Sequence, residues 1–438
     1  MVKTKEIITY AIFGAIVALV IYAASQTVAY RPFLRIQNAI DDSHFKRRSM
    51  LNGEGVAEKE RIVIIDIDDR SIEMLGKFKY WPREHFGKVI GAVKGDGALL
   101  TFLDVIPMEG GSSRDNSVLA DSARSAGNVL AGYYFNLDAP SIKQRPLDPV
   151  FNEQMSSGML YPEYLNGNHF IKAEEIVLPY ARLAVSVCGL GFTNYVPDPD
   201  RVVRHLPLYV SYGDILYPSA ALQMWLHVRG MRYSKVKMSP RGITLGDTLI
   251  PTDRHCFLRV NYAGTYPAFQ TLSFVDVLQG NFHDGTFDGG IAMIGSSSTL
   301  LKDLKRTPVH PALPGVEIHA SALHQLLHER FLSVTPGNII FSMTLAFGVI
   351  TAILFTVAPP VKVGLPVALI IPCGLYLLAL YSFTVHSVLM NISLPSFVVL
   401  ILYIVITIHR FVEKHEAAAR TLHDPEPTPQ NSDKFVSG

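Results

Sequence analysis

The sequence predicts a mixed α/β (α+β) exported domain together with four transmembrane helices. Long apolar stretches lie near both ends of the 438-residue chain, and each is long enough to cross about 30 Å of hydrocarbon. Between them, short apolar runs typical of buried strands alternate with stretches typical of helices. Lys plus Arg (39) nearly balances Asp plus Glu (38), so no net charge points to nucleic acid as a partner.

The first apolar stretch runs from Ile7 to Ala29 without a charged residue and predicts a transmembrane helix. Lys3 and Lys5 precede it, which favours a cytoplasmic amino terminus by the positive-inside rule. A secretory signal peptide is the alternative, because the small residues of AASQTVA could form a cleavage site.

The second apolar region runs from Phe331 to Ile408, where Lys362 is the only charged residue. It predicts three more spans, at about 338–358, 363–384 and 389–408. With four crossings, both termini and the Lys362 loop lie on the cytoplasmic side, and residues of about 31–330 are exported.

The predicted organisation therefore has four parts. They are the amino terminus with the first span (1–30), the exported domain (31–332), three spans (333–410) and a short tail (411–438). In the tail, FVEKHEAAARTLH extends the last helix, whereas DPEPTPQNSDKFVSG has the composition of a disordered segment. Such a tail is too short to form a catalytic domain.

The first half of the exported domain reads as alternating strands and helices. IVIIDI (62–67) is a short apolar run typical of a buried strand, and Asp68 or Asp69 caps a helix that ends at Gly76. A helix over 82–93, a strand over 98–106, a helix over 117–126 and a strand over 128–136 follow. The crossover between the first two strands predicts that they are parallel neighbours.

The second half is less regular. Residues 138–180 are expected to be mostly loop, and 189–210 reads as two strands joined by the turn PDPDR. Further predicted elements are a helix over 217–230, short antiparallel strands over 242–264, a buried strand over 289–295 and a helix over 317–332 that leads to the membrane.

Carboxylates gather where the first two predicted strands end. Asp66 and Asp68 share one face of the first strand, Asp104 ends the second, and Asp115 lies on the following loop. Three or four carboxylates would suit a hard cation, so Asp66, Asp68 and Asp104 are candidate ligands of Ca²⁺ or Mg²⁺. The alternative is structural: these acids cap helices and close the loops at the strand ends.

A second candidate site is GSSSTLLKD (295–303), where Ser296 and Ser297 could present backbone N–H groups to an anion. The segment satisfies neither the P-loop pattern nor the nucleophile-elbow pattern. A capped turn is therefore favoured.

The third candidate is HQLLH, with His324 and His328 on one helix face. Gln325 stands where a zinc protease would need its glutamate base, so structural or solvent-facing histidines are expected. Cys188 and Cys256 in the exported region could pair, but two free thiols are favoured over a disulfide.

Several longer segments resemble one known family when they are read in order. These are IVIIDIDDRSIEMLG, WPREHFGKVI, ALLTFLDVI, RDNSVLADSARSAGNVLAG, GLGFTNYVPDPDRVVRHLPL, FLRVNYAG, IAMIGSSSTLLKDLKRTPV and LPGVEIHASALHQLL. Together they resemble the type-two CHASE extracellular sensor domain over nearly all of residues 35–332. One span before the domain and three after it are also this family's usual setting.

The resemblance implies a bacterial inner-membrane receptor whose sensor domain lies in the periplasm or outside the cell. It implies that Asp66 or Asp68, Asp104, Asp115, Asp198 and Asp200 belong to the family's acidic signature, with no established catalytic role. Relatives continue into a kinase or cyclase domain, which this chain is not expected to contain.

These observations favour a noncatalytic sensor that binds a ligand or a protein partner and relays the signal to an output protein supplied in trans. A structural scaffold subunit of a membrane-anchored assembly is the alternative, and an exported metal-dependent hydrolase ranks below both. The expected partners are the membrane, a signalling output protein or a periplasmic assembly component, and a second copy of the chain. No cofactor is expected apart from the candidate Ca²⁺ or Mg²⁺.

Overall fold

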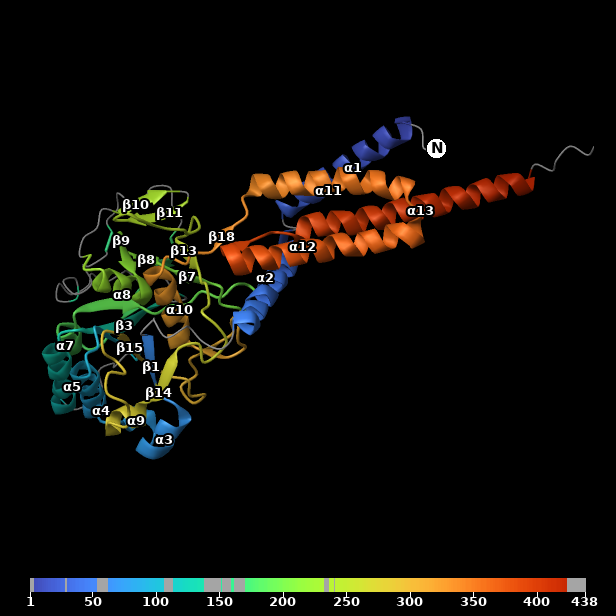
Figure 1. Cartoon of the computed structure of the whole chain (residues 1–438). Coiled ribbons are helices and arrows are strands. Elements are labelled where there is room, and N and C mark those ends of the chain that lie inside the picture. Colours follow the sequence, from blue (N-terminus) through green and yellow to red (C-terminus); the bar gives the residue numbers. More distant parts are fainter. Residues whose placement is uncertain are drawn as a thin grey trace, which may run out of the picture. The chain divides into compact units, whose positions relative to one another are not determined.

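The computed structural model describes residues 4–27, 30–52, 62–105, 113–137, 151, 159–160, 170–231, 236–239 and 241–423. They belong to two compact units (Figure 1). The helical unit is drawn from residues 1–40 and 334–438, and the α/β unit from residues 41–333. The boundary falls inside α2 (Tyr30–Asn52). The predicted disordered tail and most of the predicted loop after Asp104 lie outside the described residues.

The helical unit contains the four predicted membrane helices. They are α1 (Thr4–Ser25), α11 (Gly337–Val357), α12 (Leu365–His386) with the preceding π-helix η3 (Pro360–Gly364), and α13 (Ser393–His423). All four are long and apolar enough to cross a membrane, which confirms the predicted transmembrane helices. The segment FVEKHEAAARTLH continues α13 as a helix, as predicted.

Small residues bring α1 and α11 close together. A Cβ atom placed on Gly348 would lie 2.8 Å from the Cβ of Ala18 and 2.8 Å from the carbonyl oxygen of Gly14. Such contacts allow two backbones to approach within a membrane, where packing replaces the hydrophobic effect. At the end of α11, the Arg410 guanidinium of α13 donates hydrogen bonds to the carbonyl oxygens of Phe355 and Ala358. Arg410 therefore caps α11 and ties it to α13.

The α/β unit is built on a seven-stranded sheet in the order β14-β1-β15-β2-β3-β5, with β6 also paired to β3. The strands are β1 (Ile62–Asp66), β2 (Leu100–Leu103), β3 (Val129–Asn136), β5 (Glu175–Val177), β6 (Gly189–Phe192), β14 (Gln270–Ser273) and β15 (Ile291–Gly295). All pairs are parallel except β3 with β5. The central strands are buried on both faces, as continuous apolar runs predict.

The order of the central strands differs from the prediction. β1 and β2 are parallel, but they are not neighbours, because β15 lies between them and pairs with both. β15 comes from a segment almost 200 residues later in the chain, and no local pattern specifies where such a strand inserts. The predicted adjacency of these two strands was therefore wrong.

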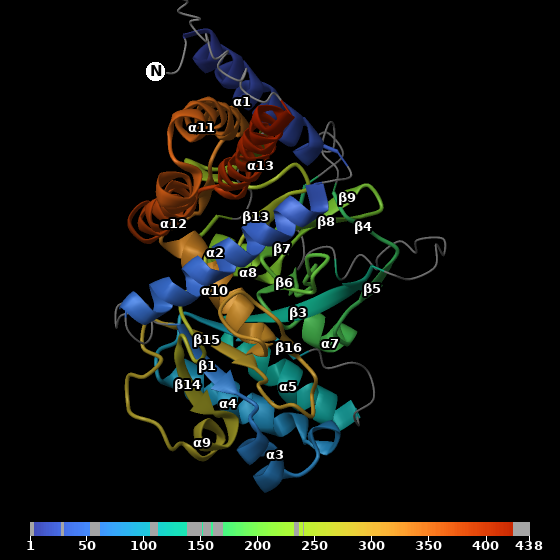
Figure 2. The ribbon, with the colours of Figure 1, turned by 90° about the vertical axis from the view of Figure 1, so that its right-hand side faces the viewer.

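Helices cover both faces of this sheet (Figures 1 and 2). One face carries α4 (Arg83–Gly95), α5 (Ser113–Ala126), α9 (Phe274–Gln279) and the adjoining α3 (Asp69–Leu75) and η1 (Phe78–Tyr80). The other carries α8 (Ala220–Val228) and α10 (Gly315–Leu327), which pack on each other and on the central strands. The short helix α7 (Ala181–Ala184) packs beside α5. The arrangement is a three-layer α/β domain, in agreement with the predicted fold class.

Small sheets complete the α/β unit. They are β4 (Lys172–Ala173) with β8 (Tyr209–Tyr212) and β9 (Ile215–Pro218), β10 (Val236–Ser239) with β11 (Gly242–Leu245) and β12 (Thr248–Ile250), β7 (His205–Pro207) with β13 (Phe257–Arg259), and β16 (Leu304–Lys305) with β17 (Leu313–Pro314). The short strands β18 (Ser333–Val334) and β19 (Val388–Leu389) precede α11 and α13. The strands around PDPDR do not pair with each other, because β6 joins the main sheet whereas β7 pairs with β13.

Candidate functional site

Serine and aspartate side chains meet at the carboxyl ends of β1, β14 and β15. We call the group formed by Asp66, Asp68, Asp69, Ser273 and Ser296–Ser298 the Ser–Asp cluster. Asp66, the last residue of β1, is 6% exposed, and its carboxylate accepts hydrogen bonds from the backbone N–H (2.7 Å) and the hydroxyl of Ser297. Burial raises the pKa of Asp66, the bonds from Ser297 oppose the rise, and Asp68 and Asp69 add to it.

The other acids of the cluster hold local structure together. Asp68 is the N-cap of α3, and its Oδ1 accepts from the Ser71 backbone N–H at 2.8 Å and from the Ser273 hydroxyl at 2.9 Å. Asp69 accepts from the Ser298 hydroxyl at 2.6 Å. The Ser296 hydroxyl donates to the carbonyl oxygen of Ile67 at 2.8 Å. The cluster therefore links three strand ends through hydroxyl–carboxylate hydrogen bonds.

Asp104 lies apart from Asp66, because β15 separates the strands that lead to them. Its Oδ2 atom is buried and has no hydrogen-bond partner in the described part of the chain. Burial raises the pKa of Asp104 well above its usual value, the Asp303 carboxylate adds to the rise, and Lys305 opposes it. Lys305 forms an ion pair with Asp303 (Nζ–Oδ1 3.1 Å), and its Nζ lies 5.5 Å from the centre of the Tyr195 ring.

Asp115 lies in the first turn of α5, where its Oδ1 accepts the backbone N–H of Arg83 at 3.0 Å. This bond holds the start of α5 to the start of α4. Of the four predicted acids, only Asp66 and Asp68 therefore share one cluster. Within the described ranges, no three His, Cys, Asp or Glu side chains are arranged to hold a metal ion, so a Ca²⁺ or Mg²⁺ site stays a prediction.

A buried arginine that the sequence analysis did not single out organises a second polar cluster. Arg204 is 3% exposed, and its guanidinium forms ion pairs with Asp42 (2.7 Å), Asp198 (2.7 Å) and Asp200 (2.8 Å). Burial lowers the pKa of Arg204, but hydrogen bonds to the three carboxylates outweigh burial and raise it. We call these four residues the Arg204 cluster. In the sequence, the closely spaced charges of PDPDRVVR indicate that Arg204, Asp198 and Asp200 form a cluster. Asp42 is far from this segment in the sequence, so no local pattern links it to the cluster.

The Arg204 cluster is part of a larger attachment between α2 and the strands β7 and β13. Asp41 of α2 is 2% exposed and pairs with Arg259 at 2.7 Å. Two turns further along α2, Arg48 donates to the Asn261 side chain (2.6 Å) and to the carbonyl oxygen of Tyr262 (2.9 Å). The part of α2 that follows Asp41 is therefore fastened to the body of the α/β unit.

His319 and His324 lie on the buried side of α10, whereas His328 at its C-cap is exposed. His319 is 0% and His324 is 5% exposed, and burial lowers the pKa of each to about 4, which keeps both rings neutral at pH 7. Gln325 accepts the backbone N–H of Asn261 (2.9 Å) and donates to the carbonyl oxygen of Arg259 (3.0 Å). Gln325 therefore ties α10 to β13 and to the segment that follows it.

The cysteines also follow the prediction. Cys188 and Cys256 are free thiols, and burial raises the pKa of Cys188 to about 11. A thiol with so high a pKa is mostly protonated at neutral pH and is a poor nucleophile. Neither residue therefore supports nucleophilic catalysis.

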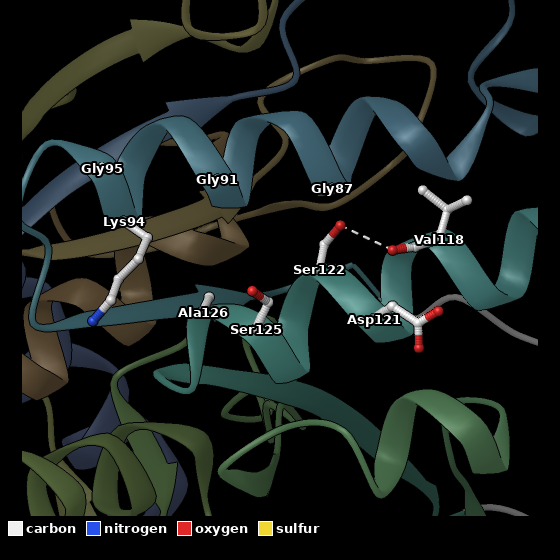
Figure 3. Close-up of a pocket in the computed structure, with 9 residues that line it drawn as sticks. All are labelled: Gly87, Gly91, Lys94, Gly95, Val118, Asp121, Ser122, Ser125 and Ala126. Carbon is white, nitrogen blue, oxygen red and sulfur yellow. Dashed lines mark hydrogen bonds between the residues drawn. The ribbon is translucent and has the colours of Figure 1, made fainter.

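An open groove of about 660 Å³ runs between α4 and α5 (Figure 3). It is lined by Gly87, Gly91, Lys94, Gly95, Val118, Asp121, Ser122, Ser125 and Ala126. A Cβ atom on Gly87 would lie 2.6 Å from the Ser122 hydroxyl oxygen, so the helices meet there, whereas one on Gly91 would have no neighbour within 4 Å. The groove has a glycine-rich wall on α4 and carries the polar side chains of Lys94, Asp121, Ser122 and Ser125.

Comparison with known proteins gives one match. A family model described as "CHASE2 domain" matches residues 15–359, which run from within α1 to just beyond α11. No curated protein and no solved structure matches the chain at a significant level.

Proposed function

The chain belongs to the CHASE2 domain family of sensor domains, and from this premise we propose that it is a noncatalytic receptor-like protein of the bacterial inner membrane. Its exported α/β unit binds a ligand or a protein partner, and its membrane helices relay that event to an output protein supplied in trans. Both termini lie in the cytoplasm. The observation that carries the proposal is the family match, which covers the α/β unit together with α1 and α11 in one continuous stretch.

The attachment of α2 supports a relay. α2 follows α1 in the chain, and its part beyond Asp41 is held by ion pairs to Arg204 and Arg259. Ion pairs and hydrogen bonds of this density make that part of α2 move with the strands that it contacts. A change in the α/β unit is thereby passed to the chain segment that leads to α1. A ligand can drive this change only if it binds two states of the unit with different affinity.

The end of α13 supports an output in trans. The residues 411–419 are exposed along the whole segment, with Phe411 62% and Val412 47% exposed. Phe411 and Val412 stand next to the charged residues Glu413, Lys414 and Glu416, so this end of α13 offers both apolar and charged side chains to a protein partner. We assign this segment of α13 as the contact surface for the output protein.

Affinity purification of the full-length protein from its native membrane, followed by mass spectrometry, tests the proposal. We expect a kinase, cyclase or response regulator to co-purify with the wild-type protein and to be lost from Phe411→Ala. Leu249→Ala, which removes a side chain that is 44% exposed on the α/β unit, is the matched control and should retain that partner. A preparation that holds only structural proteins of a membrane-anchored assembly would reject the sensor and support the scaffold alternative.

A further inference from the structure

The side chain of Gln37, in the first half of α2, holds the start of α13. It is 7% exposed, its Oε1 atom accepts the backbone N–H groups of Ile392 (3.1 Å) and Ser393 (3.2 Å), and its Nε2 atom donates to the carbonyl oxygen of Met390 (3.0 Å). α13 begins at Ser393, and the first N–H groups of a helix have no acceptor within the helix. One side chain of α2 therefore caps the amino-terminal end of α13.

Residues 388–393, all of which the structure describes, do not provide this cap themselves. A Ser, Thr, Asp or Asn directly before a helix usually accepts its first N–H groups. Here that position is Ile392, which has no side-chain oxygen, and the Ser393 hydroxyl donates to the Asn391 side chain at 2.9 Å. The start of α13 thus depends on Gln37, a residue 355 positions before Ile392 in the chain.

Apolar contacts join the same part of α2 to the first turns of α13. Phe33 lies one turn before Gln37, and its ring packs edge-on against the ring of Phe397, with ring centres 5.2 Å apart. Ile40, one turn after Gln37, packs against the apolar cluster that contains Ile392. Residues three and four positions apart lie on one face of a helix. This face of α2 therefore follows the start of α13 through both packing and hydrogen bonds.

The next turn of α2 is bound to the α/β unit. Asp41 and Asp42 stand four and five residues after Gln37, which is about 6–8 Å further along the helix axis. They form the ion pairs with Arg259 and Arg204, respectively. α2 is one uninterrupted helix across the boundary between the two units, and a rigid helix carries a displacement from one of its turns to the next. Movement of Asp41 and Asp42 is therefore felt at Gln37.

We propose that α2 couples the α/β unit directly to α13, and that Gln37 is the positioning residue through which the coupling passes. A displacement of α2 at Asp41 and Asp42 moves Gln37 and, with it, the start of α13. Because α13 is one helix of 31 residues, the displacement reaches its far end, where Phe411 and Val412 are exposed. The role of that end as an output surface rests on the proposed function, whereas the coupling of α2 to α13 does not.

A double-mutant cycle on the full-length protein in lipid nanodiscs tests the coupling, with hydrogen–deuterium exchange of residues 390–397 as the measurement. Asp42→Ala removes the ion pair between α2 and Arg204, while Asp198 and Asp200 still pair with Arg204. We expect this variant to raise the exchange rate of residues 390–397 by at least about threefold, because its effect is passed through α2 to α13. Tryptophan fluorescence checks that the α/β unit remains folded.

Gln37→Met keeps the length of the side chain but removes its hydrogen bonds to α13. In this background, Asp42→Ala should cause no further rise, because substitutions at coupled residues have non-additive effects. Gln26→Met is the matched control, since Gln26 is exposed and its Nε2 atom donates to the neighbouring Ser25 hydroxyl at 3.1 Å. Asp42→Ala should keep its full effect in the Gln26→Met background.

An exchange rate that Asp42→Ala leaves unchanged, in a protein whose α/β unit is folded, would overturn the coupling. An equal rise in the Gln37→Met background would also overturn it, because Gln37 would then be a structural cap only. If Gln37→Met does not fold, Gln37→Asn, whose side chain is one methylene group shorter, takes its place with the same two outcomes. The exchange measurement needs no output protein, so a failed co-purification would leave its result untouched, and loss of the coupling would leave the co-purification untouched.

Discussion

At the scale of single residues, the strongest constraint on the α/β unit is the charge balance of the Arg204 cluster. One buried guanidinium faces three carboxylates from two distant parts of the chain, Asp42 in α2 and Asp198 and Asp200 before β7. Removing one member of a buried ion pair costs more than the pair contributes, because the remaining charge keeps its desolvation penalty. The cluster should therefore be intolerant of substitution at Arg204.

We expect Arg204→Ala to destabilise the α/β unit by about 3–5 kcal/mol, because it removes the buried guanidinium that three carboxylates share. Both tryptophans of the chain, Trp81 and Trp225, lie in this unit and are 7% and 0% exposed, so tryptophan fluorescence during thermal unfolding reports on it. Arg70→Ala, which removes the exposed ion pair with Asp276, is the matched control and should leave the midpoint nearly unchanged. Equal midpoints for Arg204→Ala and the wild type would contradict the assigned role.

The same residues set the response of the α/β unit to acid. Burial acts to raise the pKa of Asp198, but hydrogen bonds from His205 and Arg204 outweigh it, and the pKa of Asp200 is lowered chiefly by its bond to Arg204. A lowered folded-state pKa contributes stability above the unfolded value of about 4, and this stability is lost as the pH falls through the folded value. Glu317 has the opposite effect on the pH dependence of stability. Because its folded-state pKa is raised, the α/β unit loses stability as the pH rises toward about 8.

At the scale of elements, α4 contains a glycine that lowers the stability of the helix and that helix packing does not require. Gly87 is needed where α4 meets Ser122 of α5, but Gly91 is exposed and would have room for a side chain. A glycine inside a helix lowers its stability by roughly 0.5–1 kcal/mol relative to alanine. Gly91 therefore leaves the groove between α4 and α5 open, and the helix is less stable than it would be with alanine at this position.

We expect Gly91→Ala to stabilise the α/β unit by about 0.5–1 kcal/mol, because the added methyl group meets open space and lowers the entropy of the unfolded chain. Gly87→Ala should be destabilising, since its Cβ atom would lie 2.6 Å from the Ser122 hydroxyl oxygen and 3.3 Å from the Ser122 Cβ. Thermal unfolding followed by tryptophan fluorescence measures both. A lower midpoint for Gly91→Ala than for the wild type would contradict the open space beside Gly91.

At the scale of the whole molecule, the number of membrane helices determines which parts of the chain lie on the same side of the membrane. An even number of crossings places residues before α1 and after α13 on the same side of the membrane, and the α/β unit on the other. We propose that this side is the cytoplasm, because positive residues flank the spans there.

Cysteine labelling in spheroplasts checks this topology. We expect a membrane-impermeant maleimide to label Lys77→Cys, an exposed position of the α/β unit, and to leave Lys414→Cys on α13 unlabelled until detergent is added. The wild-type background should be low, because Cys256 is buried, Cys188 is half-buried and Cys373 lies in a membrane helix. Labelling of Lys414→Cys in intact spheroplasts would contradict the cytoplasmic carboxyl end.

The features that the sequence predicted correctly are those set by local physical chemistry. The membrane helices follow from the length of uncharged apolar segments, and α3 follows from a capping aspartate and a terminating glycine only a few residues apart. The buried strands follow from continuous apolar runs. Asp68 lies near Asp66 because the two residues are close in the sequence at the end of β1.

The tertiary structure alone decided everything that depends on contacts between distant segments. Insertion of β15 between β1 and β2 separated Asp104 from Asp66 and brought Ser297 to Asp66 instead. Folding also joined Asp42 to Arg204 and buried Glu317 in the first turn of α10. Apolar patterning states that a strand is buried but not which strand lies beside it, because the hydrophobic effect has no direction and the order of strands is settled by the packing of the whole domain.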